Sequence, residues 1–311
     1  MVNALYHVLA ALRETETTVS GERLSGQLGI SRVAIWKHIR ELRRQGYGVE
    51  SYARGYRLVS VPDLLLPGEF PGWESRIHHF TEIDSTMRVA RELARAGADE
   101  GTVVIAEKQT RGRGRLGRMW MSPAGGIYLT VITRPRVAPT LAPRANLIAA
   151  VAVATTLQAM LGVSARVKWP NDVLIEGKKV CGILSEMEAE SDTVHYINVG
   201  IGMNVNVPVG DAVLNSVSLA ESVGKPVDRV RLTRQLVTRL LQYLRELDSP
   251  TVLEMWKEMS DTLGRHVSIQ QGEKHVKGLA VDVVDSGALV VRGPDGVNSA
   301  VFAGDCLYEE T

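Results

Sequence analysis

The sequence has few cysteines and almost no net charge, and both facts narrow the possible functions. Its 311 residues include two cysteines, Cys181 and Cys306, too few and too far apart for a disulfide framework or a zinc site. We therefore expect buried or neutral thiols in a reducing compartment. The formal net charge is +1, so no global imbalance points to nucleic acid or to a membrane surface.

Targeting and membrane signals are also lacking. Residues 1–16 have no basic segment before their apolar stretch and no small-residue cleavage site soon after it, so they do not resemble a secretory signal. No segment reads as apolar over the length that a membrane span needs. By elimination, we expect a cytoplasmic protein with no membrane partner.

The sequence does contain enough apolar residues for a sizeable core and enough length for several domains. Apolar residues make up 45% of the chain, and 311 residues suit two or three domains. We expect an α+β, multidomain protein with a winged helix-turn-helix, a linker, a mixed α/β domain and a small SH3-like β-barrel. The expected boundaries are 1–62, 63–75, 76–263 and 264–311.

The first region has the outline of a winged helix-turn-helix. Helical spacing of apolar residues predicts one helix near the N-terminus, a second after Ser20 and a third from Ser31 to Gln45. Residues 47–52 and 56–60 predict two short strands that form a hairpin. Residues 1–62 carry nine Lys/Arg against five Asp/Glu, an excess of four positive charges where the whole chain has one. This local excess favours contact with phosphate.

The third predicted helix separates an inward apolar face from an outward basic face. On a helical wheel, Ile35, Ile39 and Leu42 fall together, and Lys37 and Arg40 fall opposite. Helix-turn-helix proteins read bases with the N-terminal end of this helix. We expect operator DNA with a two-fold repeat, read by a dimer. The alternatives are a winged helix that binds protein and a relic that no longer binds DNA. The predicted DNA-binding residues are Ser31, Arg32, Val33, Trp36, Lys37, Arg40 and Arg54.

The rest of the chain changes pattern twice. Residues 61–73 hold three prolines and two glycines, as a linker does. From about residue 76, buried strands alternate with helices, including a long apolar one at 146–161. The tail from Gly264 is a run of short strands separated by glycine-containing turns, which suits a small barrel.

A loop rich in glycine and arginine, residues 112–118 (GRGRLGR), lies between apolar strands at 103–105 and 127–129. Glycine allows a ligand to approach the backbone closely, and arginine offers planar, permanently charged donors to phosphate or carboxylate. No Gly-Lys-Ser/Thr ends the loop and its glycines do not open a helix, so it is neither a P-loop nor a dinucleotide fingerprint. We favour an anion-binding loop over a solvated basic loop or an RNA-binding segment.

Residues 168–172 (KWPND) follow a predicted strand and precede a hairpin. A carboxylate at Asp172 can hold Mg²⁺ or a ribose, and Lys168 can meet phosphate; an ordinary Pro-Asn-Asp turn is the alternative. Lys178 and Lys179 are adjacent in the returning strand. Because adjacent strand residues face opposite sides, only one of these two lysines can face a pocket.

These segments occur together and in order, and the whole chain resembles the bifunctional biotin–protein ligases that also act as biotin-operon repressors. The resemblance implies a central ligase domain of the class II synthetase-like type. It is carried by five motifs: Asp84-Ser85-Thr86, residues 112–118 followed by Met119-Trp120, residues 168–172, residues 178–184 (KKVCGIL) and residues 200–204 (GIGMN).

The resemblance implies a reaction in two steps. The carboxylate of biotin attacks the α-phosphorus of ATP, which gives biotinyl-5′-adenylate and pyrophosphate. A lysine of a biotin carboxyl carrier protein then attacks this mixed anhydride and forms an amide. Biotin and ATP are substrates, Mg²⁺ accompanies ATP, and no tightly bound prosthetic group is needed. The adenylate also acts as corepressor, in a homodimer that binds the operator.

The resemblance also assigns residues to each ligand. The implied catalytic residues are Lys179, Arg113 and Arg115. The implied biotin-binding residues are Ser85, Thr86, Met87, Gln109, Gly112, Arg113, Gly114, Arg115, Lys179 and Gly182. The implied ATP-binding residues are Arg115, Arg118, Trp120, Lys168, Asn171, Asp172 and Asn204, with Asp172 also the Mg²⁺ ligand.

Two positions depart from the family pattern. Met87 stands where the family often has Asn, and Met119 where Lys is common, so one biotin contact and one phosphate contact are in question. Two other functions stay open: a ligand-sensing regulator without turnover, and an acyl ligase for lipoate or octanoate. Lys179 and the two arginines of the loop favour turnover, whereas Ser85-Thr86 with the loop favours biotin.

Overall fold

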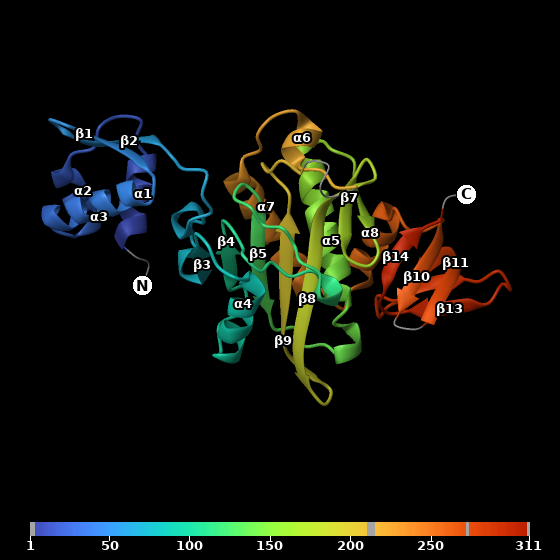
Figure 1. Cartoon of the computed structure of the whole chain (residues 1–311). Coiled ribbons are helices and arrows are strands. Elements are labelled where there is room, and N and C mark those ends of the chain that lie inside the picture. The colour runs from blue at the N-terminus through green and yellow to red at the C-terminus, as the bar shows by residue number, and fades with distance from the viewer. Residues whose placement is uncertain (1–3, 210–214, 272–273, 310–311) are drawn as a thin grey trace. The chain divides into compact units, whose positions relative to one another are not determined.

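The computed structural model describes residues 4–209, 215–271 and 274–309. Contacts within the chain divide it into two compact units, Met1–Ile77 and His78–Thr311 (Figure 1). The predicted regions 1–62, 76–263 and 264–311 each include a few residues outside the described ranges. The two units are described one after the other.

The first unit contains three helices and one β-hairpin, which confirms the predicted winged helix-turn-helix. Ser20 and Ser31 cap the second and third helices, with each side-chain oxygen accepting a backbone N–H bond of 3.0–3.1 Å. The second helix ends at Gly29, which adopts a left-handed conformation (φ 65°). The elements are α1 (Ala4–Arg13), α2 (Gly21–Leu28), α3 (Arg32–Arg44), β1 (Gly48–Tyr52) and β2 (Gly55–Ser60).

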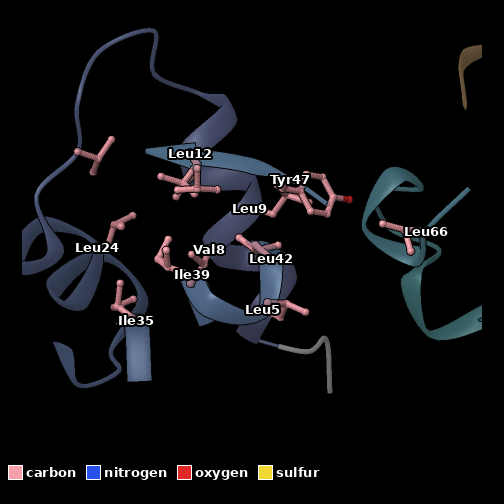
Figure 2. Packing of buried hydrophobic residues seen from close by; sticks show 13 residues of the cluster. Leu5, Val8, Leu9, Leu12, Leu24, Ile35, Ile39, Leu42, Tyr47 and Leu66 are labelled. Atoms are coloured by element: carbon pink, nitrogen blue, oxygen red, sulfur yellow. The ribbon is translucent and has the colours of Figure 1, made fainter. Parts of the chain in front are cut away.

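The core of this unit includes part of the predicted linker (Figure 2). Leu9 of α1 and Ile39 of α3 are fully buried, and Leu66 packs against the same cluster. Glu69, which is 2% exposed, accepts a hydrogen bond from Tyr47 and forms an ion pair with Arg13. The segment 63–75 is therefore a packed part of the first unit and contains two short 3-10 helices, η1 (Pro67–Glu69) and η2 (Glu74–Arg76).

The second unit is built on a seven-stranded sheet in the order β3-β4-β5-β9-β8-β7-β6. From β4 to β6 each neighbouring pair is antiparallel. The strand predicted before residues 168–172 is β6, and the hairpin predicted after them is formed by β7 and β8. The strands are β3 (Ile77–Phe80), β4 (Val103–Ala106), β5 (Ile127–Thr133), β6 (Ala165–Lys168), β7 (Asp172–Ile175), β8 (Lys178–Glu190) and β9 (Thr193–Met203).

Helices pack on this sheet, and one of them corrects an expectation. The stretch Pro139–Leu161 is long and apolar enough to cross a membrane, contrary to the sequence prediction. In the most apolar part of this stretch, 67% is buried, and the helix packs against the sheet and against α7 and α8. It is therefore a core helix. The helices are α4 (Thr86–Arg95), α5 (Arg144–Leu161, preceded by the 3-10 helix η4 at Pro139–Leu141), α6 (Leu219–Val223), α7 (Arg229–Arg245) and α8 (Pro250–Met259).

The C-terminal part of the second unit is a five-stranded antiparallel sheet in the order β13-β12-β11-β10-β14. Alternate residues such as Val267 and Ile269 are buried, so one face of β10 packs inward. A run of short strands was predicted here. The strands are β10 (His266–Gln271), β11 (Lys274–Val283), β12 (Leu289–Arg292), β13 (Asn298–Val301) and β14 (Asp305–Tyr308).

Candidate functional site

A cavity of about 660 Å³ lies in the second unit. It is lined by residues of the large sheet, of the loop 112–118 and of β14. This size suits a small-molecule site. Fifteen of the sixteen residues predicted to bind biotin or ATP line it. They are Ser85, Thr86, Met87, Gln109, Arg113, Gly114, Arg115, Arg118, Trp120, Lys168, Asn171, Asp172, Lys179, Gly182 and Asn204.

Gly112 is the one residue predicted to bind biotin or ATP that does not line the cavity. A Cβ at this position would lie 2.4 Å from the carbonyl oxygen of Trp120 and 2.7 Å from Ser122 Oγ. The amide of Trp120 donates to the carbonyl of Gly112 at 2.9 Å. Glycine is therefore needed here because the two sides of the loop approach closely.

A chain of polar side chains crosses one part of the cavity. Thr130 Oγ1 donates to Thr86 Oγ1 at 2.9 Å, and Thr86 Oγ1 donates to Gln109 Oε1 at 3.2 Å. The amide of Gln109 in turn donates to Ser122 Oγ at 3.0 Å. Thr130 and Ser122 were not predicted. The signal for Thr130 was a threonine in the middle of the largely apolar strand β5, where it is fully buried.

Lys179, and not Lys178, faces the cavity. Its Nζ lies 2.7 Å from Asp172 Oδ1, and it also lies over the Trp120 ring, 5.2 Å from the centroid. Lys178 is exposed and is not among the cavity residues. The predicted alternation of this lysine pair is confirmed.

The indole of Trp120 rests on two glycines of the sheet. A Cβ on Gly202 of β9 would lie 2.5 Å from Trp120 Nε1, and one on Gly182 of β8 would lie 2.9 Å from the ring. Both strands therefore need glycine for the ring to lie flat against them. Trp120 Nε1 is shielded from solvent and has no hydrogen-bond partner among the residues that the structure describes, so it can donate to a ligand.

Two arginines of the loop reach β14 in the C-terminal sheet. Arg115 donates to the side-chain oxygen of Asn171 and to the carbonyl of Gly304, both at 3.2 Å, and Arg118 forms an ion pair with Asp305. Burial lowers the pKa of Arg115 from its ordinary value, and the carboxylates of Asp305 and Asp172 oppose this shift. No local pattern in the tail had marked Asp305 as part of the site.

The cavity is rich in cations and poor in groups that bind metals. Among residues 4–209, 215–271 and 274–309, no three His, Cys, Asp or Glu side chains gather to hold a metal ion. Asp172 offers a carboxylate, but Lys179 already pairs with it. A single carboxylate suits a metal ion that keeps several waters better than one that needs a full set of protein ligands.

In the first unit, the predicted DNA-binding residues lie on α3, at its N-cap and in the turn of the hairpin. Val33 and Trp36 have exposed fractions of 64% and 45%, which is high for apolar side chains. Arg40 stacks on Trp36 with its guanidinium 4.7 Å from the ring centroid. The structure leaves the whole predicted set exposed: Ser31, Arg32, Val33, Trp36, Lys37, Arg40 and, in the hairpin turn, Arg54.

Three family models match successive parts of the chain. A helix-turn-helix (HTH) domain matches residues 5–57, the biotin/lipoate A/B protein ligase family matches residues 80–204, and the biotin protein ligase C-terminal domain matches residues 262–307. The first match covers the winged helix-turn-helix described above. The second contains most of the residues that line the cavity, and the third covers the C-terminal sheet.

Relatives over nearly the whole length combine these three parts. The bifunctional ligase/repressor BirA of Bacillus spizizenii is 37% identical over 301 residues, 92% of each chain. The protein of that name from Escherichia coli is 32% identical and covers 92% of this chain and 91% of its own. The biotin protein ligase from Aquifex aeolicus, solved with biotin and ATP, has a TM-score of 0.63 at 27% identity, over 76% of this chain and 99% of that one. The chain therefore belongs to the biotin/lipoate A/B protein ligase family, and within it to the bifunctional ligase/repressors.

Proposed function

We propose that this protein joins biotin to a lysine of a biotin carboxyl carrier protein through biotinyl-5′-adenylate, and that it represses transcription in response to biotin. The observation that carries the ligase proposal is the cavity itself. It unites a chain of hydroxyl and amide groups with Lys168, Lys179 and three arginines, as a ligand with a polar head and a phosphate requires.

The uncharged polar end of the cavity binds biotin. Thr86, Gln109 and Ser85 offer donors and acceptors for the ureido head, and Thr130 fixes the hydroxyl of Thr86. Met87 is 3% exposed, and its sulfur would lie 3.4 Å from a Cβ built on Gly200. It therefore supplies an apolar wall in place of the polar contact that asparagine would give.

The cationic end binds the phosphates of ATP. Arg113, Arg115 and Lys179 contact the biotin carboxylate and the α-phosphate, where negative charge develops as the adenylate forms. Arg118, Lys168 and Asn171 serve the outer phosphates. Trp120 and Asn204 meet the adenine. Met119 is 73% exposed and leaves its share of the phosphate contacts to the neighbouring cations.

Mg²⁺ would accompany ATP in this cavity. The chemistry it supplies is neutralisation of phosphate charge, and Asp172 is the residue that would hold it. Since Asp172 pairs with Lys179 at 2.7 Å, the carboxylate also orients the lysine that faces the reacting phosphate.

Biotin-dependent release of pyrophosphate from ATP tests adenylation, and transfer of [¹⁴C]biotin to a biotin-carrier domain tests the second step. We expect both signals with biotin and neither with lipoate or octanoate in its place. Adenylation with lipoate but not biotin would establish the acyl ligase alternative. Tight biotin binding without pyrophosphate release would identify a sensor that has lost turnover.

The first unit binds operator DNA through α3 and the hairpin. The exposed basic face of α3 supports this, because a solvated side chain is free to meet the DNA backbone. A dimer that forms in the adenylate-bound state reads a two-fold repeat. DNA affinity should rise when biotin and ATP are both added, and equal affinity with and without them would remove the regulatory half of the proposal.

Lys37→Ala should weaken DNA binding at every sequence to a similar degree. One phosphate contact accounts for a slope of about −0.9 in a plot of log K against log salt concentration, so the slope should become shallower by about that amount. Fluorescence anisotropy over a range of salt concentrations measures it. Glu22→Ala, an exposed change on α2, is the control. An unchanged slope for Lys37→Ala would place this lysine away from the backbone.

Gly202→Ala should weaken ATP binding. The added methyl group would lie 2.5 Å from the Trp120 indole, and overpacking of this kind costs about 1–3 kcal/mol, so the KM for ATP should rise at least about fivefold. Pyrophosphate release measures the KM. Gly26→Ala is the control because its methyl group meets open space. A normal KM for the Gly202 variant would show that Trp120 does not contact the nucleotide.

The finer fold assignments follow the same proposal. The central domain is of the class II synthetase-like type, and the five-stranded C-terminal sheet is an SH3-like small barrel. The short antiparallel strands of that sheet support this. Functional boundaries lie near residues 77 and 262.

The protein works in the cytoplasm, where thiols stay reduced. Cys181 and Cys306 are both buried and unpaired, and burial raises the pKa of Cys306 to about 11. This thiol is therefore protonated and unreactive at neutral pH, although it lines the cavity.

A further inference from the structure

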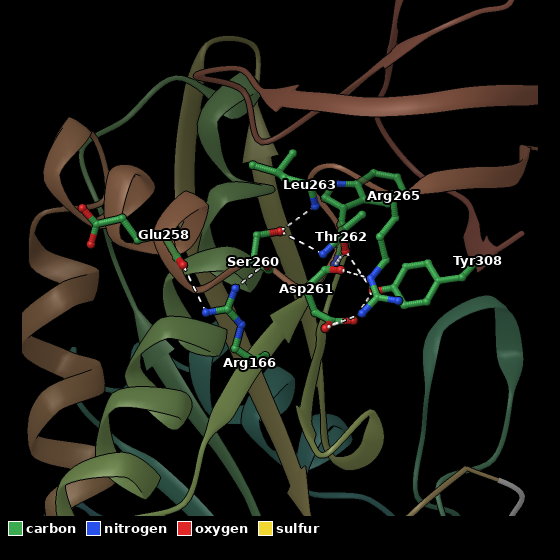
Figure 3. A network of polar contacts seen from close by, with 9 residues as sticks. Arg166, Glu258, Ser260, Asp261, Thr262, Leu263, Arg265 and Tyr308 are labelled. Carbon is green, nitrogen blue, oxygen red and sulfur yellow. Dashed lines mark hydrogen bonds and ion pairs between the residues drawn. The ribbon is translucent and has the colours of Figure 1, made fainter. Parts of the chain in front are cut away.

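The connection between α8 and β10 joins the large sheet to the C-terminal sheet (Figure 3). Arg166 of β6 donates to the carbonyls of Glu258 and Ser260 at 3.3 and 2.9 Å. The amide of Trp169 donates to Thr262 Oγ1 at 2.9 Å, and its indole donates to the carbonyl of Gly287 at 3.1 Å. On one side of Lys168, β6 is thus anchored to the end of α8; on the other side, Trp169 is anchored to the residue Thr262 before β10 and to Gly287 between β11 and β12.

Tyr308 of β14 stands at the centre of this junction. Its hydroxyl donates to Asp261 Oδ2 at 2.9 Å, and Asp261 Oδ1 pairs with Arg265 at 3.0 Å. Two cations lie over its ring: Lys168 Nζ at 4.3 Å and the Arg265 guanidinium at 4.6 Å from the centroid. Both distances are within the range of a cation–π interaction.

An aromatic ring can hold a lysine ammonium group in place without neutralising its charge, whereas a carboxylate neutralises it. Lys179 and Arg118 in the same cavity are paired with Asp172 and Asp305. For Lys168, no carboxylate lies within ion-pair distance among the residues that the structure describes. The face of Tyr308 fixes the ammonium group but leaves its charge and its N–H donors for a phosphate.

We infer that Tyr308 is a positioning residue for adenylation, which holds Lys168 toward the phosphates of ATP. The inference rests on the proposed function, since it takes ATP as the ligand of Lys168. It gives the C-terminal sheet a defined task, because a residue of β14 sets the place of a cation that belongs to the ligase domain. Tyr308 itself acts through Lys168 and is not a catalytic residue.

The test compares variants by the KM for ATP and the KM for biotin in pyrophosphate release. Tyr308→Leu should raise the KM for ATP by about two- to thirtyfold, the range of a cation–π interaction, and leave the KM for biotin within about twofold. Tyr308→Phe keeps the ring and should behave as the wild type. Phe302→Leu removes an exposed aromatic ring next to the same sheet and is the matched control.

A double-mutant cycle separates positioning from a structural role. If Tyr308 acts through Lys168, the variant with both Lys168→Met and Tyr308→Leu should be no worse than Lys168→Met alone. If the two substitutions together raise the KM for ATP by the product of their separate effects, the inference is overturned. A normal KM for ATP in Tyr308→Leu, or an equal defect in Tyr308→Phe, would also overturn it. Should Tyr308→Leu not fold, pentafluorophenylalanine in place of Tyr308 keeps the shape of the ring and reverses its quadrupole. A normal KM for ATP in that variant would also overturn it.

A failure of the proposed function can be distinguished from a failure of the role of Tyr308. If the wild-type protein releases no pyrophosphate with biotin and ATP, ATP binding is measured directly by calorimetry with the same variants. Equal ATP affinity of the wild type and Tyr308→Leu would then overturn the role of Tyr308. Normal adenylation by Lys168→Met would exclude Lys168 from the phosphate site, and with it the route through which Tyr308 acts.

Discussion

Lys179→Ala should slow biotin-dependent release of pyrophosphate by about two to three orders of magnitude, while biotin still binds. The lysine faces the cavity, with its Nζ 2.7 Å from Asp172 and over the ring of Trp120. A fixed ammonium group at this place stabilises the charge that develops on the phosphate, and its removal takes away one charge-stabilising donor from the transition state. The polar chain of Thr130, Thr86, Gln109 and Ser122 does not involve Lys179, so biotin should still bind after the loss of one contact to its carboxylate.

Lys178→Ala is the matched control for this variant. It removes the same side chain one residue earlier in β8, where the lysine is exposed and outside the cavity. Single-turnover formation of adenylate measures the chemical step, and calorimetry measures biotin affinity. Equal rates for Lys179→Ala and Lys178→Ala would remove Lys179 from the reaction. A loss of biotin binding that matches the loss of rate would assign it to binding instead.

The first unit could be predicted from the sequence because its signals are local. Ser20 and Ser31 mark the starts of helices by capping, and apolar spacing marks the inward face of α3. The linker prediction was incomplete for a physical reason. The prolines and glycines in 61–73 indicate only that long helices and strands are disfavoured. Leu65 and Leu66 are buried, and these leucines determine where the segment packs.

The residues of the candidate site that belong to sequence motifs could be predicted. The residues that a distant strand adds to the site could not. The site residues predicted from the family resemblance lie within 85–87, 109–120 and 168–182 and at Asn204, and all of them except Gly112 line one cavity. The contribution of β14 was not predicted, because Asp305 lies 187 residues from Arg118 in the sequence. A pattern of short strands predicts a sheet but not which of its residues reach a loop elsewhere in the chain.

Arg229→Met should destabilise the second unit by about 3–5 kcal/mol, because it leaves a buried carboxylate without its permanently charged partner. The guanidinium of Arg229 lies 2.9 Å from Glu107 Oε2 and donates to the carbonyl of Gly126 at 2.8 Å, with both side chains at most 5% exposed. His79 Nε2 lies 3.0 Å from the other oxygen of Glu107. For a unit of this size the change corresponds to a fall in Tm of about 6–20 °C.

The same pair should matter for the site, which makes the prediction more specific than a loss of stability. Glu107 directly follows β4 and Gly126 directly precedes β5, so Arg229 ties together the two stems from which Gln109 and the Gly-Arg loop extend. Thermal unfolding measures stability, and the KM for biotin below the unfolding transition measures the position of Gln109. Arg231→Met, an exposed change on the same helix, is the control, and Arg229→Lys should recover part of the stability because it keeps the charge. A Tm within about 2 °C of the wild type for Arg229→Met would mean that Glu107 is held without the arginine. A large fall in Tm with a normal KM for biotin would confine the pair to stability.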